Sequence, residues 1–208
     1  LANHKASSPP GTEYLRMLLA THLAHQPGTT FSYTNADYAL LGAAIEEATG
    51  KSYEDYCRAA VLTPSGAAGT LDQDLAVLWA FGGWRMTGDN YLAFYEIFEP
   101  RSSLLGRGVI AWMSNPAGKT YGRTSFPAWY GLGVRLRNRG QGIEIWHTGS
   151  WSRRLPAPTR NSNTSTRAFR SPEGWSVFVH STPLVGGNAR NELLDQLIQA
   201  VRSIKNWN

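Results

Sequence analysis

The stretch Ile143–Ser150, with the sequence IEIWHTGS, decides much of the predicted fold. Its apolar residues indicate a buried strand, and the strand ends in a histidine, a threonine and a glycine. Far upstream, the stretch Phe31–Asn35 (FSYTN) leads into a helical pattern. These two motifs are the starting points from which the rest of the chain is interpreted.

Around Ile143–Ser150 the hydrophobic pattern has a period of two, which predicts an antiparallel meander of about four strands. A turn at 138–142 leads into the central strand, and a polar, proline-containing loop at 150–162 follows it. The predicted strands are 130–136, 143–148, 165–170 and 175–180.

The remaining segments predict helices, at 12–25, 36–49, after Ser52, after Thr87 and at 188–205. Asn35 is the expected N-cap of helix 36–49, and Gly50 fits its C′ position. The aromatic stripe after Thr87 indicates core packing in preference to a ligand platform. Helices come first and the sheet second, so the fold class is α+β, an antiparallel sheet flanked by helices. The helical part spans about 1–128, and the sheet with a closing helix spans about 129–208.

Composition excludes several classes of function. The chain has 208 residues, 42% of them hydrophobic and 17% charged, which suits one globular domain. It contains no apolar run long enough for a membrane span, and no signal core at its start. Its formal net charge of +5 comes from scattered arginines, so a nucleic-acid partner is not expected. A single cysteine, Cys57, excludes an internal disulfide, and neither a metal site nor another cofactor is expected.

The two motifs carry residues that could take part in catalysis or substrate binding. Tyr33 becomes a candidate base if a neighbouring cation lowers its pKa from about 10, and Asn35 could hold a substrate amide or that cation. Thr148 offers a hydroxyl, Gly149 permits close approach of a substrate, and the backbone N–H of Ser150 could stabilise an oxyanion. On local spacing alone, a structural role remains the more common alternative for each motif.

Taken together, the motifs resemble the serine β-lactamase and D,D-peptidase superfamily, on the branch of class C β-lactamases, D-alanyl-D-alanine carboxypeptidases and β-lactamase-like esterases. Those proteins carry Ser-x-x-Lys, Tyr-x-Asn and Lys/His-Thr-Gly in this order. The segment Pro27–Gly42 matches the second element with its surroundings, and Trp146–Ser150 matches the third. Gly82-Gly83-Trp84 and Tyr130-Gly131-Leu132-Gly133 match as well, so the resemblance covers nearly the whole chain.

The chain departs from this pattern in one large respect, because Ser-x-x-Lys is absent. The residues three positions before its four lysines are Ala2, Ala48, Pro116 and Arg202. The resemblance therefore implies a fold that is incomplete at its N-terminus, with the nucleophile on an N-terminal segment of the same protein. A degenerate homologue is the alternative.

By resemblance, the full protein is a serine hydrolase that acts through an acyl-enzyme on an amide or ester of a small molecule or peptide. The implied catalytic residues are Tyr33, Asn35, His147, Thr148 and Ser150. Gly149, Arg153 and Arg154 are the implied substrate-binding residues. His147 stands where relatives carry lysine or histidine, so its charge would help to ionise Tyr33. The alternative is a non-catalytic, penicillin-binding-like binding or sensor protein, and a periplasmic or secreted location is favoured.

Overall fold

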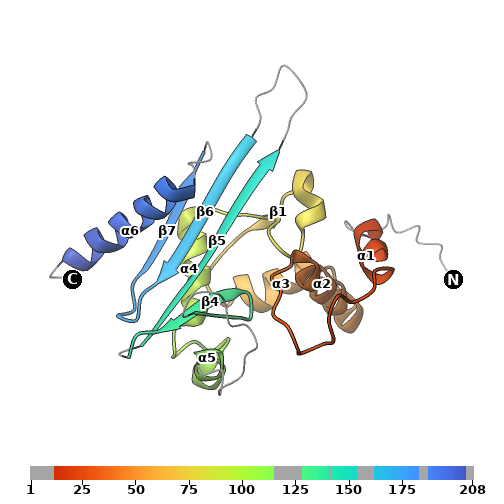
Figure 1. Ribbon diagram of the computed structural model, residues 1–208, viewed down its shortest axis with the longest axis horizontal. Coiled ribbons are helices and arrows are strands. Elements are labelled where there is room, and N and C mark those ends of the chain that lie inside the picture. Colours follow the sequence, from red (N-terminus) through yellow and green to blue (C-terminus); the bar gives the residue numbers. More distant parts are fainter. Residues whose placement is uncertain (1–11, 115–127, 141, 154–161, 183–186, 205–208) are drawn as a thin grey trace.

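A computed structural model describes residues 12–114, 128–140, 142–153, 162–182 and 187–204. A five-stranded antiparallel sheet, in the order β3-β4-β5-β6-β7, lies between helices on its two faces (Figure 1). This arrangement confirms the predicted α+β class and an antiparallel meander. The meander has five strands instead of about four, because a turn at Leu132 and Gly133 divides the predicted strand 130–136 into β3 and β4. Within the described residues, no helix is both long enough and apolar enough to cross a membrane.

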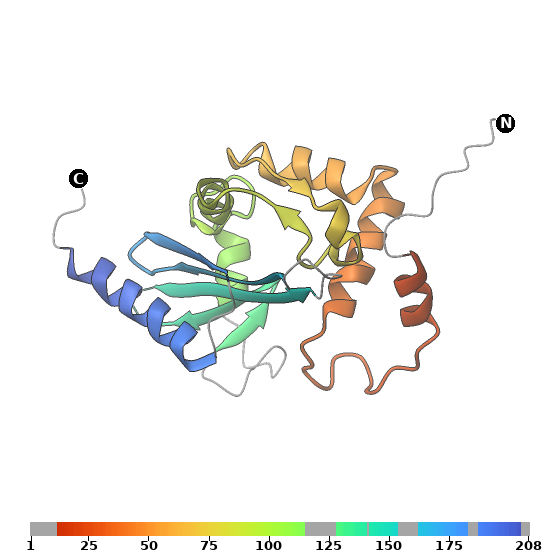
Figure 2. The same cartoon turned by 90° about the horizontal axis from the view of Figure 1, so that it is seen from above.

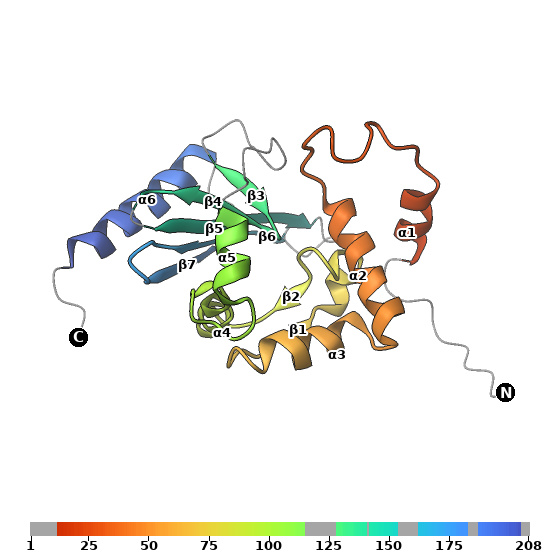
Figure 3. The same ribbon diagram turned by 90° about the horizontal axis from the view of Figure 1, so that it is seen from below.

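Helices dominate the first half of the described chain. Figures 2 and 3 show the first three of them gathered beyond one end of the sheet. A small two-stranded sheet, β1-β2, which the sequence did not predict, also forms in this half. The elements are α1 (Thr12–Leu19), α2 (Asn35–Thr49), α3 (Tyr53–Cys57), a π-helical turn η1 (Arg58–Leu62), β1 (Thr70–Leu71), a 3-10 segment η2 (Gln73–Leu78), β2 (Trp84–Arg85), α4 (Gly88–Tyr95), a 3-10 turn η3 (Glu96–Phe98) and α5 (Gly106–Ser114).

Local capping explains where several helices begin. Ser52 and Thr87 accept hydrogen bonds from backbone N–H groups in the first turns of α3 and α4, as their sequence positions predicted. The predicted cap of α2 was wrong by one residue: Thr34 accepts from the N–H of Ala36, and Asn35 is the first helical residue. Gly50 ends α2 with a φ of 64°, which glycine adopts without strain.

The first helix is shorter than predicted. It ends at Leu19, whereas the sequence indicated a helix over 12–25. The backbone N–H groups of Ala20 and Thr21 still bond to carbonyls of the last turn, and the chain then leaves the helix. Leu19 and Leu23 are both exposed, so no apolar face continues past the last turn to hold a longer helix against the protein.

The five-stranded sheet consists of β3 (Trp129–Gly131), β4 (Val134–Asn138), β5 (Ile143–Arg153), β6 (Ser162–Arg170) and β7 (Ser176–Ser181). The predicted loop at 150–162 was too long, because β5 runs on to Arg153 and β6 already begins at Ser162. Ser150 pairs with Ser165, and Arg153 pairs with Ser162. By contrast, the register of β4 with β5 ends at the pair Arg135 and Trp146, so β5 extends well beyond its other neighbour.

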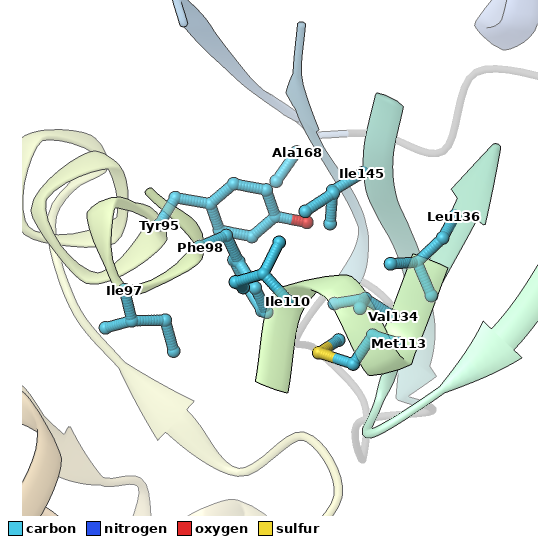
Figure 4. Packing of buried hydrophobic residues seen from close by; sticks show 9 residues of the cluster. All are labelled: Tyr95, Ile97, Phe98, Ile110, Met113, Val134, Leu136, Ile145 and Ala168. Atoms are coloured by element: carbon cyan, nitrogen blue, oxygen red, sulfur yellow. The ribbon is translucent and has the colours of Figure 1, made fainter. Parts of the chain in front are cut away.

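The sheet buries apolar side chains on both faces. One face packs under α4, η3 and α5 around Tyr95, Phe98 and Ile145, and Figure 4 shows this cluster. The predicted aromatic stripe therefore lies in the core. The other face holds Phe169 against the closing helix α6 (Gly187–Ser203). Because neighbouring residues of a strand point to opposite faces, Ile145 and Trp146 belong to different clusters.

Helix α2 is held very close to the segment that follows η2. A Cβ atom added at Gly42 would lie 2.5 Å from the Cβ of Ala80 and 2.6 Å from the ring of Trp79. Such separations are shorter than carbon atoms tolerate, so only glycine fits this position without a shift. The midpoint of α2 is thereby fixed against a buried tryptophan.

Candidate active site

Tyr33 lies in the extended segment just before α2, and its side chain is 50% exposed. Thr34, the next residue, has extended backbone angles and caps the helix. Asn35 is exposed in the first turn of α2. The two motif residues therefore flank the cap, with Tyr33 two positions before the first helical residue and Asn35 at that residue.

His147 is the first residue of β5 beyond the register with β4. Its side chain is half-buried. By strand alternation it lies on the face of Ile145, while Thr148 lies on the face of Trp146. From here to Arg153, β6 is the neighbouring strand of β5 in the described sheet. The end of the strand thus offers a backbone edge on the side away from β6.

The fold brings Tyr33 and His147 together although they are far apart in sequence. Their ring centroids are 6.5 Å apart. Tyr130 of β3 lies beside both: its ring is 5.3 Å from that of Tyr33, nearly perpendicular, and 6.1 Å from that of His147. The hydroxyl of Tyr130 is 3.5 Å from Nε2 of His147. These three side chains form the candidate site, named here the Tyr33–Tyr130–His147 cluster.

A second layer supports this cluster from α2 and the β3–β4 turn. The ring of Tyr38 lies 6.5 Å from that of Tyr130, again nearly perpendicular, and the two side chains are hydrogen-bonded. Tyr38 also bonds to the backbone of Gly133. Gly133 has a φ of 83°, and Leu132 beside it has a φ of 49°, so the turn that presents Gly133 is tight and left-handed.

Electrostatics at the cluster correct one expectation. Burial, together with the positive charge of Arg135 on β4, lowers the pKa of His147 below its usual value of about 6.5. The imidazole is therefore mostly neutral at neutral pH and does not supply the positive charge that the sequence suggested. Burial also raises the pKa of Tyr130, which keeps its hydroxyl protonated. At neutral pH the cluster can donate, accept and pass a proton, but it contains no serine.

The remaining predicted site residues follow His147 along β5. Thr148 is half-buried opposite Arg167, and Ser150 is exposed opposite Ser165. Gly149 pairs with Thr166, whose hydroxyl oxygen would lie only 3.0 Å from an added Cβ atom. Arg153 is the last residue of the strand, and Arg154 lies outside the described residues.

The sequence did not single out Tyr130, Tyr38 or Arg135 as site residues. One signal for Tyr130 was present, since it opens the Tyr-Gly-Leu-Gly motif. Its contact with Tyr33 and His147 depends on how α2 and the sheet meet, which no local pattern reports. Within the described part of the chain, no three His, Cys, Asp or Glu side chains gather as they would to hold a metal ion.

Comparison with known proteins identifies a family and a shared fold. A family model described as Beta-lactamase matches residues 1–183. No curated protein sequence matches the chain. Among solved structures, a penicillin binding protein from Bacillus halodurans is similar with a TM-score of 0.64 and 16% identity, covering 92% of this chain and 64% of its own. SurE with D-Leu gives 0.69 and 18%, covering 100% and 52%.

A D-amino acid amidase from Ochrobactrum anthropi SV3, complexed with L-phenylalanine amide, gives a TM-score of 0.60 at 18% identity. The match covers 88% of this chain and 60% of the amidase. At these identities the three structures establish a shared fold. The chain spans between about half and two thirds of the length of each of them.

Proposed function

The chain belongs to the beta-lactamase family, and from this premise we propose that it forms part of a serine hydrolase whose nucleophile lies on a segment outside these 208 residues. The full enzyme attacks an amide or ester carbonyl with a serine, forms an acyl-enzyme and releases it to water. The proposal assigns proton handling and substrate positioning to this chain. It assigns Ser-x-x-Lys to an N-terminal segment of the same protein, because no lysine here has a serine three residues before it.

The observation that carries the proposal is the meeting of Tyr33 and His147. Their rings lie 6.5 Å apart, next to the part of β5 that extends beyond its neighbour β4. A phenol and an imidazole that merely filled a core would be buried, whereas the side chain of Tyr33 is half-exposed. An acid–base pair with one half-exposed member, Tyr33, next to a strand end suits proton transfer to a bound substrate.

In the proposed mechanism the lysine of Ser-x-x-Lys supplies the positive charge that keeps Tyr33 as a phenolate, and Tyr33 accepts the proton of the attacking serine. Asn35 positions the substrate and that lysine. The backbone N–H of Ser150 stabilises the oxyanion of the tetrahedral intermediate. Thr148 then binds the substrate by its hydroxyl, and Gly149 admits the substrate backbone to the strand edge.

Two further assignments complete the mechanism. Arg153, the last residue of β5, and Arg154, which follows it in the sequence, bind a substrate carboxylate. His147 acts as a neutral hydrogen-bonding group near pH 7, because burial lowers its pKa. This role differs from that of a lysine at the same position, which would hold a permanent charge.

The names of the structural neighbours guide the choice of substrates. They include a penicillin binding protein and a D-amino acid amidase. We therefore propose that the carbonyl under attack belongs to a penicillin or to an amide of a D-amino acid. Hydrolysis of a short-chain ester is the third substrate class to measure.

The test is covalent labelling. A fluorescent penicillin and a fluorophosphonate are applied to the full-length protein and to the isolated 208-residue chain. We expect at least one probe to label the full-length protein and neither to label the isolated chain. Replacing the serine of Ser-x-x-Lys by alanine in the full-length protein should abolish labelling. Stoichiometric labelling of the isolated chain would overturn the proposed location of the nucleophile.

A second candidate is a non-catalytic binding or sensor protein that keeps the cluster without turnover. The absence of Ser-x-x-Lys from the 208 residues favours it. The coding sequence upstream distinguishes the two candidates, since a Ser-x-x-Lys motif there supports the hydrolase. A full-length protein that binds penicillin reversibly and is never labelled would support the binding protein.

A further inference from the structure

We propose that Tyr130 is a positioning residue that fixes His147 in one tautomer and orients it toward Tyr33. The catalytic consequence of this role rests on the proposed function, whereas the tautomer itself can be measured without any activity. The proposal stands on the position of Tyr130 at the centre of the cluster and on a chain of hydrogen bonds that ends at Nε2 of His147.

Tyr130 touches every aromatic ring of the site. Its centroid lies 5.3 Å from Tyr33, 6.0 Å from Phe31, 6.1 Å from His147 and 6.5 Å from Tyr38. The contacts with Tyr33, Tyr38 and His147 are edge-to-face, the geometry that the charge distribution of aromatic rings favours. A side chain packed between Tyr33 and His147 in this way sets the orientation of both.

The hydrogen bonds give this packing a direction. The backbone N–H of Gly133 can only donate, and it bonds to the hydroxyl of Tyr38. The hydrogen bond between Tyr38 and Tyr130 acts to lower the pKa of Tyr38 and to raise that of Tyr130, so Tyr130 donates and Tyr38 accepts. The hydroxyl oxygen of Tyr130 is then the acceptor for Nε2 of His147, 3.5 Å away. That distance is long for such a bond, and catalytic hydrogen bonds often shorten when substrate binds.

The surroundings of His147 make the tautomer matter. Among the described residues, the titratable and charged groups that face it are Tyr33 before α2, Tyr130 on β3, Arg135 on β4 and Tyr95 on α4. None of them is a carboxylate, and burial and Arg135 both favour the neutral ring. A neutral imidazole has one donor and one acceptor nitrogen. If Nε2 donates to Tyr130, the proton is on Nε2, and only that tautomer fits the chain of bonds.

The deciding experiment is NMR of the histidine side chains in the full-length protein labelled with 15N-histidine. Long-range 1H–15N spectra near pH 7.5 identify the tautomer of each ring, and His147→Gln identifies the signal of His147. We expect wild type to populate mainly the Nε2–H tautomer. Tyr130→Phe keeps the ring and removes only the hydroxyl, so it should shift His147 toward a mixture. Tyr38→Phe should cause a smaller shift in the same direction.

His180 provides the internal control. Its Nε2 atom lies 2.6 Å from the hydroxyl oxygen of Thr164, outside the cluster. Its signals should be the same in wild type and in Tyr130→Phe, which also shows that the variant is folded. A His147 ring with the same tautomer populations in wild type and in Tyr130→Phe would overturn the proposal.

A kinetic measurement tests the catalytic consequence. In the active full-length enzyme, Tyr130→Phe should lower kcat by about 2- to 10-fold, the usual effect of one neutral hydrogen bond, with little change in KM. Tyr130→Leu, which also removes the ring, should lower kcat further. Equal kcat values for wild type and Tyr130→Phe would overturn the positioning role. A wild-type protein without turnover would refute the proposed function alone, because the tautomer measurement still decides the role of Tyr130.

Discussion

The carboxylate of Glu144 on β5 accepts a hydrogen bond of 3.2 Å from the guanidinium group of Arg202 on α6. Glu144 is only 2% exposed, and it also pairs with Arg137 at 2.8 Å and with Arg139 at 2.9 Å. One buried carboxylate thereby joins strand β4, strand β5 and the closing helix. Burial alone would raise the pKa of Glu144, but the hydrogen bonds and charges of Arg139 and Arg137 outweigh it, and the pKa is lowered.

Replacing Glu144 by glutamine should destabilise the protein. The change keeps the shape and removes the charge, so three arginines lose their shared partner. We expect the free energy of unfolding to fall by about 1–3 kcal/mol, as for hydrogen bonds to charged groups. Urea denaturation measures this. The control is Glu13→Gln, whose ion pair with Arg16 is exposed on both sides and should change stability by less than about 1 kcal/mol. Equal effects of the two variants would contradict the prediction.

The lowered pKa of His147 predicts a pH dependence of stability. In the unfolded chain His147 binds a proton near pH 6.5, whereas in the folded chain it binds the proton only at a lower pH. The free energy of unfolding should therefore fall as the pH drops below about 6.5, and this loss should level off below the folded pKa. In His147→Gln the decrease between pH 7.5 and 5 should be smaller. Glu144 acts in a separate window, below its unfolded value of about 4.5. Parallel curves for wild type and His147→Gln would refute the assignment.

Removing the hydroxyl of Tyr33 should impair the full-length enzyme. If Tyr33 moves the proton of the serine, Tyr33→Phe should lower kcat/KM by about 10²- to 10⁴-fold, with the fold intact. The measurement is hydrolysis of a chromogenic cephalosporin and of a D-amino acid amide. Tyr14→Phe is a matched control, because this tyrosine packs on Phe81 in the helical part. An unchanged kcat/KM in Tyr33→Phe would remove Tyr33 from the mechanism.

Two glycines in helices should respond in opposite ways to alanine. Gly42→Ala brings a methyl group within 2.5–2.7 Å of Ala80 and Trp79, and overpacking of this kind costs about 1–3 kcal/mol. Gly108 in α5 has open space around it, so Gly108→Ala should raise stability by up to about 1 kcal/mol through helix propensity. Thermal unfolding of both variants checks this. A stabilised Gly42→Ala protein would show that α2 is packed less closely than described.

Short-range signals predicted much of the fold. Ser52 and Thr87 mark helix starts because a hydroxyl can satisfy backbone N–H groups within its own turn. Gly50 marks a helix end for a similarly local reason. The extension of β5 to Arg153 was missed, because Trp151 is the single apolar residue in Ser150–Arg153 and one residue shows no alternation. This part of the strand is held by pairing with β6. Helix α5 was missed because Gly106 and Gly108 weaken its pattern.

The candidate site was predictable only in part. Tyr33 and His147 were found from their motifs, but their surroundings depend on contacts between distant segments. The contact of Tyr130 with both residues requires β3 and the start of α2 to meet. The lowered pKa of His147 likewise depends on burial and on Arg135, neither of which the motif reveals. The sequence did not predict a buried role for Glu144, because its three arginine partners come together only in the folded protein.

The close contact between Gly42 and Trp79 fixes the middle of helix α2. A tilt of the helix would therefore turn about this contact. Asn35 lies seven residues from Gly42, which is about 10 Å along the helix axis. A tilt of roughly 6° at the pivot would therefore move Asn35 by about 1 Å, a displacement that can cost an enzyme about 100-fold in rate. The position of Asn35 thus depends partly on Gly42, which lies outside the Tyr33–Tyr130–His147 cluster. Variants at Gly42 should lose activity before they lose their fold.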